Sequence, residues 1–64
     1  MKRREFVRLI ESHGCVLLRE GANHSLYLNP QTGRKEAIPR HQEIQKQLSR
    51  SICRNLGVPP PMGA

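Results

Sequence analysis

Four apolar residues in the second half of the chain recur at four-residue steps: Ile44, Leu48, Ile52 and Leu56. Apolar residues at this spacing lie on one stripe of an α-helix. Gly57 follows this stripe, and three prolines come soon after it. Because glycine just past a helix and proline beyond it are typical stop signals, we expect the helix to end at Leu56. Such a helix must bury its stripe against another element.

The first residues carry a second helical pattern, which Gly14 ends. Phe6, Leu9 and Ile10 stand at i, i+3 and i+4, with charged residues between them. Between the two helical patterns lie three short stretches typical of strands, at 15–19, 24–28 and 34–39, separated by turn-forming residues. The order predicts one α+β domain over residues 1–57, α-β-β-β-α, with a three-stranded antiparallel sheet and both helices on one face. We expect residues 58–64 to form a Pro-rich flexible tail.

The second strand leaves one question open. Strict alternation places His24, Leu26 and Leu28 on one face of the sheet, opposite Tyr27. If the leucines face the helices, a bulge must turn His24 outward. If Tyr27 faces the helices, Leu26 and Leu28 form an exposed apolar stripe that fits a protein partner.

The charge balance points to a polyanionic partner. Eleven Lys and Arg residues stand against five Glu, and the chain has no Asp, which gives a net charge of +6. The chain has no carboxylate pair, no zinc-ligand spacing of Cys and His and no glycine-rich phosphate loop, so we expect neither a metal nor a cofactor. No apolar run is long enough for a membrane span or a signal peptide. We therefore expect a cytoplasmic protein with Cys15 and Cys53 as reduced, packed thiols.

Histidine is the remaining candidate for catalysis, since imidazole is a general acid and base near neutral pH. His24 follows Gly21, Ala22 and Asn23, and a glycine there lets the chain turn sharply and lets a nucleic-acid backbone come close. His41 follows Pro39 and Arg40, at the expected start of the second helix, and is a candidate second acid/base or phosphate contact, or a plain loop histidine. His13 is interpreted as a packed or capping residue.

On RNA a histidine needs no cofactor, because it can take the proton of the 2′-hydroxyl, whose oxygen then attacks the adjacent phosphate. Cationic side chains stabilise the charge that develops on that phosphate. The candidate RNA-binding residues are Lys46, Arg50 and Arg54, which form a row on the second helix, together with Arg40, Gly21 and Asn23. A non-catalytic RNA-binding module is the alternative hypothesis.

Over residues 1–57 the order of motifs resembles the HicA-type toxins of bacterial toxin–antitoxin pairs. The motifs are Ser12-His13-Gly14 after a basic helix, Gly21-Ala22-Asn23-His24, Tyr27, Ile38-Pro39-Arg40-His41 and Leu56-Gly57. The resemblance implies a fold like that of double-stranded-RNA-binding domains and metal-independent cleavage of mRNA. It implies His24 as the catalytic histidine, and a HicB-type antitoxin as the protein partner that covers the active site.

Overall fold

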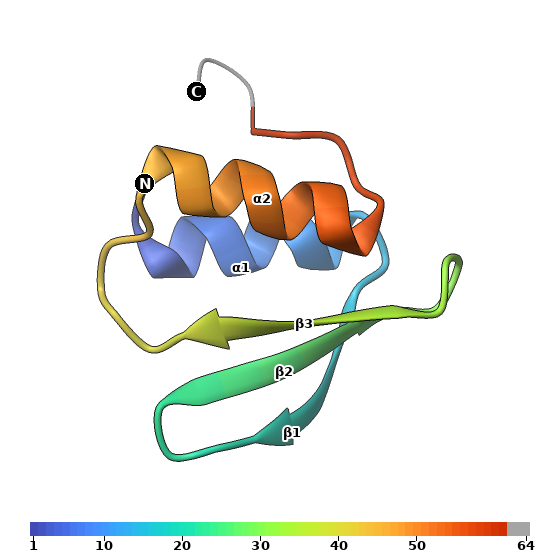
Figure 1. Cartoon of the computed structure of the whole chain (residues 1–64), viewed down its shortest axis with the longest axis horizontal. Coiled ribbons are helices and arrows are strands. Elements are labelled where there is room, and N and C mark those ends of the chain that lie inside the picture. Colours follow the sequence, from blue (N-terminus) through green and yellow to red (C-terminus); the bar gives the residue numbers. More distant parts are fainter. Residues whose placement is uncertain (62–64) are drawn as a thin grey trace.

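The computed structural model describes residues 1–61 of the chain. In this part the order is α1 (Arg3–Ser12), β1 (Val16–Glu20), β2 (His24–Asn29), β3 (Arg34–Pro39) and α2 (Lys46–Leu56). The strands form one antiparallel sheet in the order β1-β2-β3. Both helices lie on the same side of this sheet, as Figure 1 shows. The predicted α-β-β-β-α architecture is confirmed.

Helix α2 begins later than the apolar spacing implies. Ile44 is fully buried but lies in the connection before the helix, and its N–H donates a hydrogen bond of 2.8 Å to the carbonyl oxygen of Met1. The N-terminal ammonium donates in turn to the Ile44 carbonyl at 3.3 Å. Because the backbone of Ile44 pairs with the start of the chain, the helix begins at Lys46, after it.

The buried face of α2 also differs from the predicted stripe. Leu48 is 39% exposed, whereas Ser49 and Cys53 are buried beside Ile52 and Leu56. The expectation that Leu48 belongs to the core is therefore wrong. A four-residue step exceeds one turn of 3.6 residues, so the row rotates along the helix and its first helical member lies beside the contact face.

The far end of α2 is joined to the turn between β2 and β3. Gly57 ends the helix in the left-handed conformation, with φ of 79°, as the sequence predicts. The buried side chain of Asn29 donates a hydrogen bond of 2.8 Å to the carbonyl of Leu56, and the hydroxyl of Thr32 donates to the same oxygen at 3.1 Å. These contacts hold the sheet against the helix and set the position of β2.

Burial distinguishes the two faces of β2. Ser25, Tyr27 and Asn29 are buried and face the helices, while Leu26 and Leu28 are half-buried on the outer face together with exposed His24. Tyr27 therefore faces inward, and the leucines form the outer apolar stripe. The register between β1 and β2 shifts between Leu17 and Arg19, so the irregularity lies in β1. His24 faces outward by the regular alternation of β2, and no bulge turns it.

The remaining expectations about the core and the end of the chain are met in part. Cys15 and Cys53 are buried free thiols, as predicted. Val58 and Pro61 are buried as well, and the flexibility of the 58–64 tail stays a prediction, with residues 62–64 outside the described part. Neither helix within residues 1–61 has the length and apolar character to cross a membrane.

Candidate active site

His24 opens strand β2 and its side chain is exposed on the outer face of the sheet. Its backbone pairs with Pro39, the last residue of β3. The next residue along, Arg40, donates its backbone N–H to the carbonyl of Asn23 at 3.2 Å. The turn that precedes His24 is therefore held from the side by the end of β3.

Gly21 closes this turn against His24. Its N–H donates a short hydrogen bond of 2.7 Å to the carbonyl oxygen of His24. A Cβ atom on Gly21 would lie 3.1 Å from that oxygen, which is tighter than ordinary van der Waals contact. The glycines with positive φ are Gly14, Gly33 and Gly57, so the need for glycine at position 21 comes from the close approach and not from its φ angle.

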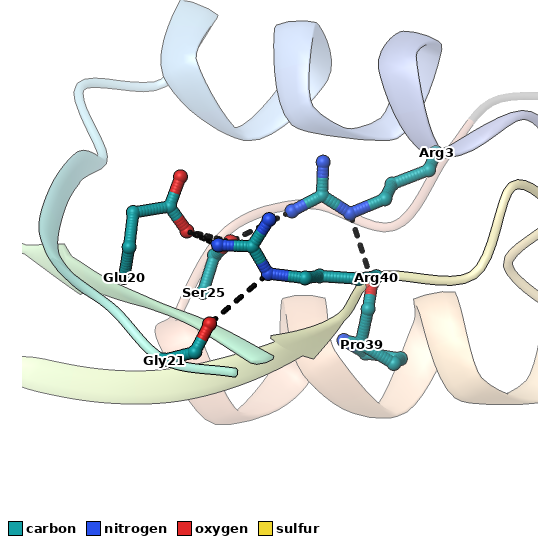
Figure 2. A network of polar contacts seen from close by, with 6 residues as sticks. All are labelled: Arg3, Glu20, Gly21, Ser25, Pro39 and Arg40. Carbon is teal, nitrogen blue, oxygen red and sulfur yellow. Dashed lines mark hydrogen bonds and ion pairs between the residues drawn. The ribbon is translucent and has the colours of Figure 1, made fainter. Parts of the chain in front are cut away.

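The side chain of Arg40 reaches across the turn (Figure 2). Its Nε donates to the carbonyl of Gly21 at 3.1 Å, and its Nη2 forms an ion pair of 2.7 Å with Oε1 of Glu20. One arginine thus holds the residue before the turn and the first residue of the turn. Because both groups are roughly half exposed, this ion pair orders the turn more than it stabilises the fold.

A second arginine, Arg3 of helix α1, joins the same network through Ser25 (Figure 2). Arg3 donates from Nε to the carbonyl of Pro39 at 2.9 Å and from Nη2 to the hydroxyl oxygen of Ser25 at 2.8 Å. The Ser25 hydroxyl donates onward to Oε1 of Glu20 at 2.6 Å. Arg40 therefore contacts the Glu20 carboxylate directly and Arg3 reaches it through the Ser25 hydroxyl, so the network beside His24 carries a net positive charge.

Three members of this network were not among the predicted site residues: Arg3, Glu20 and Ser25. Glu20 and Ser25 flank the glycine turn, so their positions offered a weak signal. Arg3 offered none, because it lies 22 residues from Ser25 and 36 residues from Pro39 in the chain. Only the packing of α1 over the sheet brings it to the turn.

The structure brings together Gly21, Asn23, His24 and Arg40 among the predicted site residues. His41 is exposed directly after Arg40, but the prediction that it stands at the start of the second helix is wrong, because that helix begins at Lys46.

The predicted row on α2 lies apart from these residues. Lys46 opens the helix, and Arg50 and Arg54 line a separate groove of about 450 Å³ with Val58, Pro60 and Pro61. Within residues 1–61 no group of three or more His, Cys, Asp or Glu side chains is placed to hold a metal ion.

Comparison with known proteins identifies the family of the chain. Searches of curated proteins and of solved structures found no match. A family model described as HicA toxin of bacterial toxin-antitoxin matches residues 3–58, which include every element of the fold and the turn that carries His24. Because the match covers most of the chain, this protein belongs to the HicA toxin family, the toxin half of bacterial toxin–antitoxin pairs.

Proposed function

We propose that this toxin is a metal-independent endoribonuclease that cleaves mRNA in the cytoplasm, with His24 as its general base. The observation that carries the proposal is an exposed histidine directly after a turn that Arg40 holds, paired with Pro39, whose carbonyl Arg3 holds. An imidazole needs access to the substrate to move a proton, and a fixed backbone to place it. His24 has both.

The reaction uses the 2′-hydroxyl of the substrate as the nucleophile. His24 takes the hydroxyl proton, the 2′-oxygen forms a bond to the adjacent phosphorus, and the bond from phosphorus to the 5′-oxygen breaks. The leaving 5′-oxygen takes a proton either from protonated His24 or from His41 as a second acid. The products are a 2′,3′-cyclic phosphate and a 5′-hydroxyl end, so DNA is not a substrate by this route.

Cationic groups supply the stabilisation of the phosphorane. Arg40 is the nearest to the catalytic turn, since its guanidinium contacts Gly21 directly. A fixed cation at the place where negative charge develops lowers the barrier without reorganisation. We assign Arg40, with Gly21 and Asn23 of the turn, to the bound phosphate, and the row of Lys46, Arg50 and Arg54 to more distant parts of the RNA.

The outer face of the sheet is where a HicB-type antitoxin would cover the site. Leu26 and Leu28 continue from His24 along the outer face of β2, and Val16 of β1 pairs with Leu28 there at 45% exposure. An apolar stripe beside a catalytic group fits a protein partner, which buries both at once. The cognate antitoxin would in this way exclude RNA from His24.

The test is incubation of the purified protein with a long single-stranded RNA in EDTA, comparing wild type with His24→Ala. We expect wild type to produce 2′,3′-cyclic phosphate ends and the variant to produce none while it still binds RNA. Because His24 is exposed, the substitution leaves the core intact, which a circular dichroism spectrum checks.

The other outcomes are equally informative. Equal cleavage by both proteins would move the chemistry away from His24, and His41→Ala would then be tested in the same assay. RNA bound but left intact by wild type would contradict the nuclease proposal and favour the non-catalytic RNA-binding module.

A further inference from the structure

A groove of about 690 Å³ runs between helix α1 and the connection from β3 to α2. Five of its nine lining residues are cationic: Lys2, Arg3, Arg4, Arg8 and Arg40. Against these five cations stand two carboxylates, Glu11 and Glu43, so the groove keeps an excess of three positive charges. Except for Arg40, none of these cations was among the RNA-binding residues that the sequence predicted.

Within residues 1–61, three of these cations have no counterion. The Glu43 carboxylate lies 3.6 Å from the N-terminal ammonium. Arg3 and Arg40 belong to the network beside His24. Over residues 1–61, the side chains of Lys2, Arg4 and Arg8 make neither a hydrogen bond nor an ion pair, and all three are exposed. Clustered cations without counterions attract a polyanion, which releases the ions held around both molecules.

Arg40 connects the groove to the turn that precedes His24. Its side chain lines the groove and at the same time contacts the carbonyl of Gly21, three residues before His24. We propose that this groove binds the phosphate backbone of single-stranded RNA and leads it over Arg40 to His24. The inference rests on the proposed nuclease function and names where its substrate lies.

The lining favours RNA over a protein partner. Four of the five cations are arginines, whose planar fork matches a phosphate in two parallel hydrogen bonds. Val7 is the single apolar residue that lines the groove, so the site lacks the apolar anchors on which protein interfaces depend. Proteins usually bind single-stranded RNA in a basic groove that follows the RNA backbone.

The test uses RNA that the enzyme cannot cut. A fluorescent 2′-O-methyl oligonucleotide lacks the nucleophile, so its binding is measured apart from cleavage. The variant is Arg4→Gln/Arg8→Gln, two exposed residues one helical turn apart on α1. The matched control is Arg34→Gln/Lys35→Gln, which removes the same charge where β3 begins, at the opposite end of that strand from Pro39 and outside the groove.

We expect the α1 variant to bind on the order of tenfold more weakly, with a salt dependence of log K that is flatter by about 1.4 for two lost phosphate contacts. The control should keep the affinity of wild type within about twofold, because it loses only long-range attraction that salt screens. Melting curves of both variants check that they fold.

Each alternative result has one meaning. An α1 variant with wild-type affinity and salt slope would refute the proposal that the groove binds RNA, whether or not the protein cleaves RNA. Loss of antitoxin binding in that variant, with RNA binding unchanged, would reassign the groove to the protein partner. If RNA binding depends on Arg4 and Arg8 but the protein cleaves no RNA, the groove is still the RNA-binding site and the proposed nuclease activity is refuted.

Discussion

Removal of the Ser25 hydroxyl tests whether the network beside His24 also stabilises the fold. Ser25 is 1% exposed, and its hydroxyl stands between two charged groups. It accepts a hydrogen bond of 2.8 Å from the Arg3 guanidinium and donates one of 2.6 Å to the Glu20 carboxylate. In Ser25→Ala both bonds are lost.

The expected cost follows from what the two partners keep. A hydrogen bond to a charged group contributes about 1.5–3 kcal/mol to stability. Arg3 keeps its bond to the Pro39 carbonyl, and Glu20 keeps Arg40 and is half exposed, so water recovers part of the loss. We therefore expect Ser25→Ala to lower the free energy of unfolding by about 2–3 kcal/mol. A domain of this size has roughly 3–5 kcal/mol in total.

The assay is thermal unfolding followed by far-UV circular dichroism. For so small a domain the expected loss lowers the melting temperature by roughly 10–20 °C. Ser51→Ala is the matched control, because Ser51 is exposed on α2, and a surface change there should stay within about 0.5 kcal/mol of wild type. If Ser25→Ala melts as Ser51→Ala does, the network orders the turn without stabilising the fold, and the reasoning is refuted.

Two further predictions concern the turn and the buried thiols. Gly21→Ala places a methyl group 3.1 Å from the His24 carbonyl, so cleavage should fall on the order of tenfold while the melting curve changes little; wild-type cleavage would show that the turn adapts. Burial raises the pKa of Cys53 above its ordinary 9.0, and the nearby Cys15 thiol raises it further; burial also raises the pKa of Cys15. Because the unfolded thiols ionise first, they should lower the urea midpoint as the pH rises from about 9 through the folded pKa values, less steeply in Cys53→Ala. A midpoint with the same pH dependence in that variant would contradict the role of the thiol.

Helix α2 separates what local patterns determine from what packing decides. Gly57 ends the helix as the sequence predicts, because a glycine that adopts positive φ is a local property of the backbone. The start of the same helix differs from the prediction, because Ile44 pairs with Met1, 43 residues away. No periodicity within the helix contains that contact.

The candidate site divides in the same way. The sequence by itself determined the order of the elements and the glycine turn before His24, because spacing and turn chemistry act over a few neighbouring residues. Only the tertiary structure decided that Tyr27 faces the helices, since alternation in a strand defines two faces without saying which one is covered. It alone placed Arg3 on Ser25 and gathered the cations of α1 beside Arg40, because residues distant in the chain meet only when the helices pack on the sheet.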